Sequence, residues 1–338
     1  MNNLYLLISP LIILLVNSFF IKKNFLKSLT GDRHQLFIEK KNIPLSGGVF
    51  LFIFSIIPFF TNIEFYFFFT IFLIGVLSDT KILKSAKIRF MIQIVTIVAL
   101  VINFNFVIND LRIPFLNLLL ENKIFSYLFF SFCLLIVTNG TNFIDGLNGL
   151  VLGYYTIVLS FVLNLELSNN FGVNQEYIIY YIIILAYLLI FNFLNKLYLG
   201  DSGSYFLGFL VGILLISIYK QYPLFSPFYV VLLLWYPCFE NLFSILRKYR
   251  FNSSPLKADN KHLHQLLFYY NYKKFNFSKL YANNIASLTI NLVNLIFFLI
   301  GSNYIYDSSI QIIIILILLF IYILSYLFLF NFRFNKNN

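Results

Sequence analysis

Residues 310–331 read IQIIIILILLFIYILSYLFLFN, an apolar run without a single charged side chain. A helix needs about 20 such residues to cross the hydrocarbon core of a bilayer. The rest of the chain shares this character, since 60% of its 338 residues are hydrophobic, only 11% are charged and the mean hydropathy is +0.84. Soluble domains carry about 25% charged residues. The sequence therefore predicts an all-α, polytopic integral membrane protein, and it excludes disordered, collagen-like and coiled-coil classes.

Ten further segments resemble this run in length or apolar content, so we expect about 10–11 transmembrane helices in a single polytopic domain, 1–338. The expected spans are 4–21, 47–60, 65–77, 90–106, 124–138, 149–166, 177–194, 204–219, 225–246, 281–300 and 310–331. The spans at 47–60, 65–77 and 124–138 are short, so they are expected to extend into their flanking loops. The first span lacks a basic leading region and a small-residue cleavage site, so we expect an uncleaved helix.

Basic residues divide unequally between the two sets of alternating connections. One set carries 21 of the 24 lysines and arginines, and the other has Arg112, Lys123 and Lys220. Lysine and arginine are enriched in cytoplasmic loops, so we expect the N-terminus outside and the C-terminus in the cytoplasm. The expected cytoplasmic loops are about 22–46, 78–89, 139–148, 195–204 and 247–280. The net charge of +11 is then mostly a topology signal; the lipid bilayer is the expected partner, and nucleic acid is not.

Two polar, glycine-rich clusters stand at expected cytoplasmic helix ends. In NGTNFIDGLNGL, which begins at Asn139, the residues Asn139, Asn142 and Asp145 follow at spacings of three and lie close to one helical face. In GDSGS, which begins at residue 200, neighbouring glycines let the backbone around Asp201 approach a ligand closely. Oxygens such as those of Asn142 and Asp201 suit Mg²⁺, which leaves its other positions to water and phosphate.

Basic side chains near these clusters suit a phosphorylated substrate. Lys87 and Arg89 follow Ser78-Asp79 after the third span, and His262 and His264 lie in the long connection after the ninth. These side chains could counter phosphate charge. Together the clusters indicate metal-assisted chemistry on a phosphorylated substrate at the cytoplasmic membrane face. Taken singly, the glycines are typical of turns, the lysines of cytoplasmic loops and the histidines of helix caps.

An ionisable residue also lies inside an expected span. Glu240 stands beside Asn241 and shortly after Pro237. Such a group is costly within a bilayer and faces protein or a cavity, and a proline there favours a kinked or broken helix. We therefore expect Glu240 either to line a groove or to make structural hydrogen bonds.

In this order, the motifs resemble those of the polyprenyl-phosphate N-acetylhexosamine-1-phosphate transferases, glycosyltransferase family 4. The resemblance covers almost the whole chain, from Pro44-Leu45-Ser46-Gly47-Gly48 through Ser78-Asp79, Asn139–Leu150 and Gly200–Ser204 to His262-Leu263-His264. It implies a multi-pass enzyme of the bacterial inner (cytoplasmic) membrane, with its active site on the cytoplasmic face. The implied reaction transfers a sugar 1-phosphate from a UDP-N-acetylhexosamine to undecaprenyl phosphate and releases UMP, which initiates a cell-envelope polysaccharide such as a cell-wall polymer or lipopolysaccharide.

The resemblance also implies roles for individual residues. Asn142 and Asp201 resemble ligands of Mg²⁺, or of Mn²⁺ in its place, and Asp79 resembles a carboxylate that acts on the acceptor phosphate. The implied catalytic residues are Asp79, Asp145, His262 and His264, and the implied substrate contacts are Asn139, Gly47, Gly48, Lys87, Arg89 and Gly203. A homodimer is compatible with the resemblance, which leaves the oligomeric state and the identity of the sugar open.

Two positions depart from the family pattern. The family's tandem aspartates appear as Ser78-Asp79, or as Asp79-Thr80 in the other register, and the third histidine of its histidine loop is Gln265. Since the pair Asn142 and Asp201 is intact, we expect activity with a shifted preference. One alternative is a lipid-carrier transporter or flippase, which would place more charge near the bilayer midplane. The other is a degenerate family member that only binds.

Overall fold

The computed structural model describes residues 4–23, 25–26, 43–59, 64–108, 110–165, 175–250 and 260–334, so parts of the expected loops at 22–46 and 247–280 lie outside it. Within these ranges the chain folds into thirteen α-helices without a strand. The helices are α1 (Leu4–Lys23), α2 (Gly47–Phe59), α3 (Glu64–Asp79), α4 (Ala86–Asn103), α5 (Pro114–Leu120), α6 (Lys123–Ile144), α7 (Leu150–Leu163), α8 (Gln175–Phe193), α9 (Gly200–Gln221), α10 (Pro227–Arg250), α11 (Leu263–Lys274), α12 (Lys279–Ser302) and α13 (Ser308–Phe334).

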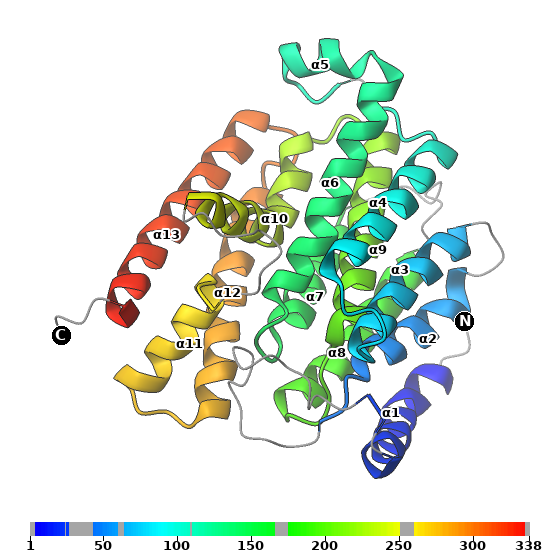
Figure 1. Cartoon of the computed structure of the whole chain (residues 1–338). Coiled ribbons are helices and arrows are strands. Elements are labelled where there is room, and N and C mark those ends of the chain that lie inside the picture. The colour runs from blue at the N-terminus through cyan, green and yellow to red at the C-terminus, as the bar shows by residue number, and fades with distance from the viewer. Residues whose placement is uncertain are drawn as a thin grey trace.

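Eleven of these helices coincide with the eleven expected spans, which confirms the polytopic all-α fold. The two additional helices lie in connections: α5 crosses the top of the bundle in Figure 1, and α11 lies in its lower part. Among the described helices, seven are long and apolar enough to cross a membrane, by length and composition, while α3 and α7 are shorter apolar helices. The chain is therefore a multi-pass membrane protein.

The helix ends reach further into the expected loops than the apolar pattern predicts. α6 continues through Asn139 and Asn142, and α9 already begins at Gly200, so the expected loops at 139–148 and 195–204 are shorter than predicted. The reason is that polar side chains at these ends find partners within the fold. Asn139 Nδ2, for example, donates to the carbonyl of Leu135 one turn earlier, at 2.9 Å.

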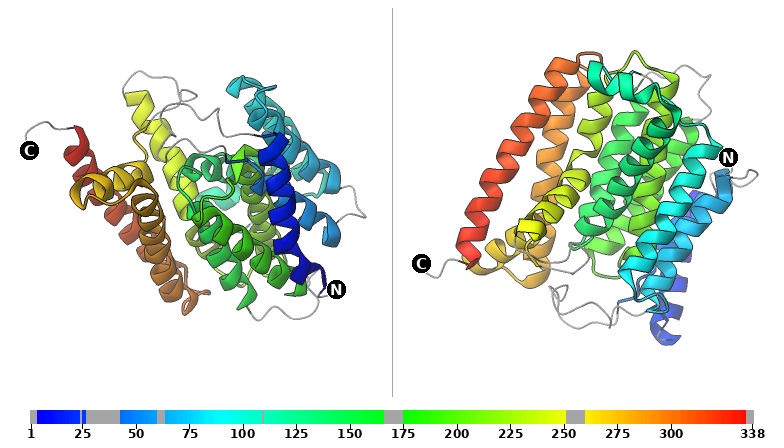
Figure 2. Two further views of the ribbon diagram at one scale, coloured as in Figure 1. Left: turned by 90° about the horizontal axis from the view of Figure 1, so that it is seen from below. Right: turned by 45° about the horizontal axis from the view of Figure 1, so that its top comes forward.

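α9 is the central helix of the bundle. It is the most buried of the seven candidate spans, with 83% of its most apolar stretch inside the protein, and α2, α3 and α6 pack directly on it. Glycines let these helices pack closely on α9, because Gly203 of α9 meets Gly48 of α2, and Gly75 of α3 meets Ser202 of α9. Figure 2 shows α12 and α13 on one flank of the α6–α9 group and α1–α4 on the other.

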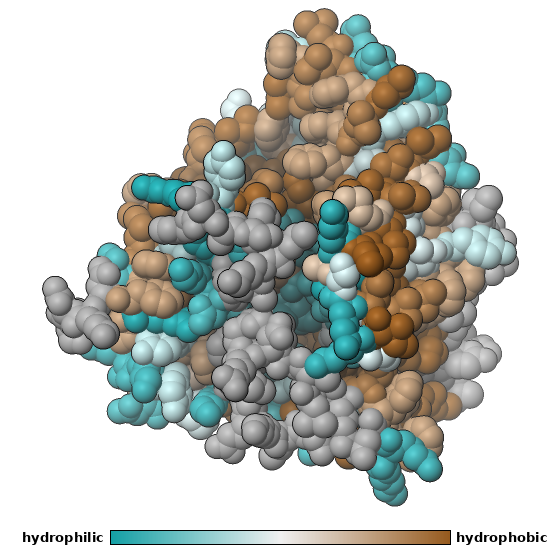
Figure 3. Space-filling view, in the orientation of Figure 1, coloured by the Kyte–Doolittle hydropathy of each residue, from teal (hydrophilic) through white to brown (hydrophobic). Residues whose placement is uncertain are grey.

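The two ends of the bundle differ in charge. At the end that carries α5, Arg112 donates to the carbonyls of Tyr306 and Leu224, and Lys220 donates to that of Asn105. The other end, where α3 and α6 finish and α9 begins, is called the motif end below. In Figure 3 hydrophobic side chains cover most of the upper part of the visible face, and hydrophilic ones gather in its lower part. Lys81 and Lys84 follow α3, and Lys196 lies between α8 and α9, so the uneven distribution of basic residues is a difference between the two ends of the bundle. Which end faces the cytoplasm stays a prediction.

Of the two expectations for Pro237, a kinked or a broken helix, the break does not occur, since α10 is one continuous helix from Pro227 to Arg250. Proline lacks an N–H, so the carbonyl of Leu233, four residues earlier, loses its helical partner. The hydroxyl of Tyr154 on α7 donates to this carbonyl at 2.9 Å. A hydrogen bond from a neighbouring helix thus replaces the one that proline removes, and the helix persists through the position.

Candidate active site

A carboxylate from α3 holds the first turn of α9. Asp79 is buried, and it accepts the backbone N–H groups of Asp201 at 2.8 Å and Ser202 at 3.0 Å. Both N–H groups belong to a helix start, where no intrahelical partner exists and negative charge is favoured. Gly200 has a φ of +77°, and a β-carbon there would lie 2.8 Å from Asp79 Oδ2. Asp79 therefore fixes the backbone that presents Asp201, and its expected action on the acceptor phosphate stays a prediction.

The side chain of Asp201 is the point where the sequence motifs meet. Asn142 Nδ2 donates to Asp201 Oδ1 at 2.8 Å. The hydroxyl of Ser78 donates to Oδ2 at 2.5 Å, and the guanidinium of Arg89 lies 3.3 Å from the same oxygen while also contacting Ser78. The predicted site residues Asn142 of α6 and Arg89 of α4 are therefore brought together around the Asp201 carboxylate of α9, with Ser78 of α3 as a third neighbour.

Asp145 adds a third carboxyl group to this region. It directly follows α6, and burial together with the negative charges of Asp201 and Asp79 raises the pKa of Asp145 well above its usual range. Carboxylates whose charges repel one another in this way favour a bound proton or a bound cation. The electrostatics of the motif end therefore suit a positively charged ligand.

The residues at this point fit a Mg²⁺ ion. Within the described ranges, no three His, Cys, Asp or Glu side chains gather as a closed metal site would require. Mg²⁺ does not need such a cage, because it is usually held by one or two carboxylates and keeps water and phosphate oxygens around it. Asp201 offers carboxylate oxygens and Asn142 an amide oxygen, and the two side chains are already hydrogen-bonded to each other.

The two predicted histidines reach the motif end on the loop before α11 and on its first turn. The His262 ring lies 5.6 Å from the ring of Phe143, the neighbour of Asn142 in sequence, and 5.6 Å from the His264 ring. His264 in turn touches the connection after α6, because a β-carbon at Gly146 would lie 2.4 Å from its Nε2. The structure thus brings both histidines beside the Asn139–Leu150 motif.

Gln265, one of the two departures from the family pattern, has a structural role. Its side-chain oxygen accepts the backbone N–H of His262 at 3.3 Å, across the start of α11. This is half of a capping box, in which the side chain of the third residue of a helix accepts the backbone N–H of the residue just before the helix. The glutamine therefore stabilises the helix start that carries His264.

The other predicted substrate contacts lie in two kinds of place. Lys87 is exposed on α4, and Asn139 is half-buried one turn before the Asn142 position. Gly47, Gly48 and Gly203 are buried where α2 meets α9, and a β-carbon at Gly48 would lie 2.2 Å from the nitrogen of Gly203. These glycines are packing positions in the structure, and their contact with a substrate stays a prediction.

Three asparagines that the sequence reading did not single out hold the connection between α6 and α7. Asn192 accepts the N–H of Gly149 at 2.5 Å, and Asn283 accepts that of Asn148 at 2.7 Å. Asn291 donates to the carbonyl of Gly149 at 3.0 Å. All three side chains are buried in apolar helices. A polar side chain inside an apolar span is costly without partners, and that signal could have identified them.

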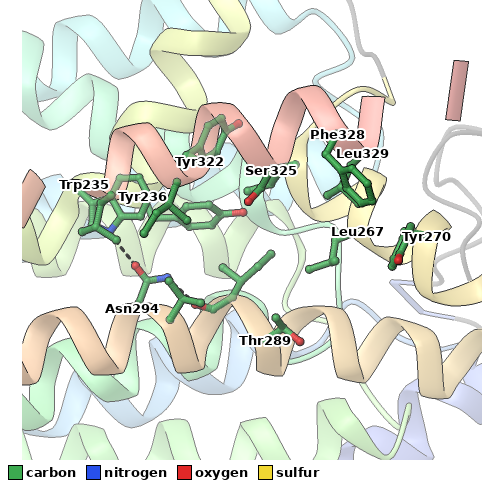
Figure 4. Close-up of a pocket in the computed structure, with 15 residues that line it drawn as sticks. Trp235, Tyr236, Leu267, Tyr270, Thr289, Asn294, Tyr322, Ser325, Phe328 and Leu329 are labelled. Atoms are coloured by element: carbon green, nitrogen blue, oxygen red, sulfur yellow. Dashed lines mark hydrogen bonds between the residues drawn. The ribbon is translucent and has the colours of Figure 1, made fainter. Parts of the chain in front are cut away.

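A cavity of about 270 Å³ lies among α10, α11, α12 and α13 (Figure 4), and Leu263, which stands between His262 and His264 in the sequence, is part of its lining. Most of its lining is aromatic or aliphatic, as Leu267, Phe328 and Leu329 illustrate, and Tyr322 forms part of its wall. None of the motif aspartates or asparagines lines it. The candidate catalytic site is therefore the polar cluster at the motif end, not this cavity.

Comparison with known proteins agrees with the motifs. Residues 63–219 match the family described as Glycosyl transferase family 4, a range that contains Asp79, Asn142, Asp145 and Asp201. A Bacillus subtilis protein described as a probable undecaprenyl-phosphate N-acetylglucosaminyl 1-phosphate transferase is 33% identical over 205 residues, which cover 59% of this chain and 56% of that protein.

Two further relatives are more distant. A phospho-N-acetylmuramoyl-pentapeptide-transferase of Dictyoglomus turgidum is 30% identical over 186 residues, covering 50% of this chain and 58% of its own length. A decaprenyl-phosphate N-acetylglucosaminephosphotransferase of Mycolicibacterium smegmatis is 29% identical over 154 residues, covering 39% and 37%. The chain thus spans little more than half the length of the first two relatives and about a third of the last.

Proposed function

Since residues 63–219 match Glycosyl transferase family 4, we propose that the chain is a member of this family and transfers an N-acetylhexosamine 1-phosphate from a UDP-sugar to undecaprenyl phosphate. The products are a lipid-diphosphate sugar and UMP, and the reaction initiates a cell-envelope polysaccharide. The observation that carries this proposal is the pairing of Asn142 with Asp201 at the motif end, next to the guanidinium of Arg89. The names of the relatives, which pair a polyprenyl phosphate with a hexosamine phosphate, support it.

The proposed chemistry needs charge neutralisation and orientation more than a strong base. An oxygen of the lipid phosphate attacks the phosphorus that carries the sugar, and the bond from that phosphorus to the oxygen of the departing UMP breaks. A phosphomonoester has its second pKa near ~6, so the acceptor is largely ionised at neutral pH. A bound Mg²⁺, or Mn²⁺ in its place, supplies charge neutralisation to the diphosphate. Asp201 and Asn142 would hold that ion, and Arg89 would counter charge on the phosphates.

We also propose that the motif end faces the cytoplasm of a bacterium, with the N-terminus outside the inner membrane and the C-terminus inside. The basic residues support this orientation, because Lys87, Arg89, Lys196 and Arg247 belong to the motif end and Arg112 to the other. A water-soluble UDP-sugar would then reach the site from the cytoplasm. The lipid phosphate would reach the same site from the bilayer.

UMP release by the purified protein in detergent tests this function, with UDP-N-acetylglucosamine, undecaprenyl phosphate and Mg²⁺ supplied. Asp201→Asn and addition of EDTA should each abolish release that depends on the acceptor. Glu121→Gln is the matched control, because it neutralises an exposed carboxylate after α5, at the other end of the bundle. Folded wild-type protein that releases no UMP with any UDP-N-acetylhexosamine would contradict the proposal.

The same experiment separates the alternatives. A transporter or flippase would move lipid between leaflets of a vesicle without forming UMP, and a degenerate member would bind the UDP-sugar without turnover. Glu240, the ionisable residue that most favours a transport pathway, makes hydrogen bonds to His262 and Tyr322 instead of standing alone within its span. The buried charge is therefore satisfied by the protein itself.

A further inference from the structure

Glu240 and His262 form a buried acid–histidine pair beside the candidate site. The carboxylate of Glu240 is fully buried on α10, and its Oε1 lies 2.9 Å from Nδ1 of His262. Its second oxygen, Oε2, accepts the hydroxyl of Tyr322 on α13 at 2.7 Å. Both carboxylate oxygens therefore have partners, which is what a buried carboxylate requires.

The surroundings of His262 hold its ring in one orientation. The ring is buried, its backbone N–H is bonded to Gln265, and its faces lie near the rings of Phe143 and His264. Since Nδ1 is directed at Glu240, Nε2 is directed away from that carboxylate by the geometry of the imidazole ring. The hydrogen bond made by one ring nitrogen decides which nitrogen carries the proton in the neutral ring.

We propose that Glu240 is a positioning residue, which keeps the proton of neutral His262 on Nδ1 so that Nε2 can accept the remaining proton of a singly ionised substrate phosphate. In that step the phosphate O–H bond breaks, its electron pair stays on the oxygen, and the proton joins Nε2. The resulting imidazolium is stabilised by the Glu240 carboxylate, as in other acid–histidine pairs. The role of the phosphate rests on the proposed function, whereas the position of the proton on the ring does not.

Tyr322 provides the matched control for this pair. It forms part of the wall of the cavity in Figure 4, and its hydroxyl reaches the Glu240 oxygen that does not face His262. Removing this hydroxyl leaves the contact between Glu240 and His262 in place. His264 is a second ionisable group beside His262, because the two rings stack. Lys248 lies over the Phe143 ring, and Arg247 donates to the carbonyl of Lys261, the residue before His262.

Nitrogen-15 NMR of histidine-labelled protein tests the position of the proton directly. The chain has three histidines, and the His262 signal is identified by its loss in His262→Gln. At a pH where the ring is neutral, we expect the proton on Nδ1 in the wild type and in Tyr322→Phe, and on Nε2 in Glu240→Leu. A wild-type spectrum with the proton on Nε2 overturns the proposal, and this result does not depend on whether any variant folds.

The kinetics of UMP release test the phosphate step. Glu240→Gln keeps the shape of the side chain but removes its charge, so we expect kcat/KM for the lipid phosphate to fall by about 10–100-fold, as when the outer partner of a functional histidine is lost. The loss should be larger at pH 6, where more of the phosphate retains a proton, than at pH 8, and KM for the UDP-sugar should not change. An equal loss at both pH values indicates a merely structural role and overturns the phosphate step. Wild-type protein without activity instead contradicts the proposed function and leaves the NMR result unaffected.

Discussion

Asp79→Ala removes the carboxylate that accepts two backbone N–H groups from the first turn of α9, at 2.8 and 3.0 Å. Burial raises the pKa of Asp79 to about 7, so the acceptor is charged above that pH. A hydrogen bond to a charged acceptor contributes about 1.5–3 kcal/mol, so the gross loss there is about 3–6 kcal/mol. Part of this loss is offset, because the Asp79 and Asp201 carboxylates repel each other and the variant relieves that repulsion. We therefore expect a net destabilisation of about 2–4 kcal/mol, consistent with losing a helix cap together with a favourable charge at a helix start.

Thermal unfolding and UMP release, measured on the same detergent preparation, check this expectation. Asp79→Asn is the matched variant, since it keeps the shape and one acceptor oxygen and should lose only about 1–2 kcal/mol. The unfolding temperature should fall from wild type to Asp79→Asn to Asp79→Ala, and activity should fall in the same order. If Asp79 acted only on the acceptor phosphate, both variants would lose UMP release yet unfold at the wild-type temperature, which would refute the capping role.

Three further outcomes are expected. Ser78→Asp sets a second carboxylate against Asp201 Oδ2, so it should lower the unfolding temperature without Mg²⁺ and reduce the Mg²⁺ concentration that restores it, as a Mg²⁺ titration of thermal unfolding would reveal. Gly48→Ala places a β-carbon 2.2 Å from the α9 backbone and should cost about 1–3 kcal/mol, whereas Gly212→Ala, which meets a flexible leucine at 3.0 Å, should unfold near the wild-type temperature. The raised pKa of Asp145 means that, above the ordinary aspartate pKa, this side chain binds more protons in the folded state than in the unfolded state, so its contribution to stability falls as pH rises. Asp145→Asn should therefore gain stability over wild type from about pH 4 upward, measured without Mg²⁺; a constant difference across pH would contradict the shift.

The spans could be predicted because a long run without charge has few alternatives to a transmembrane helix. Residues 310–331 illustrate this, since they lie entirely within α13. The helix ends were less predictable. α6 continues through Asn142, and the side chain of this residue bonds across to Asp201, 59 positions later. Apolar periodicity carries no information about such a long-range partner, so it ends the helix too early.

The candidate site shows the same limit. The spacing of the motifs was enough to propose that Asn142 and Asp201 act together, because polar residues at helix ends on the same side of a membrane can converge. It did not predict that Asp79 would bind the backbone of α9, or that Asn192 and Asn283 would hold the connection after α6. These roles depend on which helices are neighbours, and one sequence does not contain that information.

The three aspartates of the motif end differ in what their charge can do. Burial and the charge of Asp201 raise the pKa of Asp79 to about 7, and two N–H groups at the start of α9 already occupy its oxygens. Asp145 has a raised pKa and so tends to hold a proton. The side chain of Asp201 contacts Arg89, Ser78 and the amide of Asn142. A cation can displace these partners without unfolding the start of a helix. Neutralising Asp201 should therefore abolish metal-dependent activity with little loss of stability, whereas neutralising Asp79 should cost stability first. This contrast assigns separate roles to the carboxylate that holds the first turn of α9 and to the carboxylate that this turn presents.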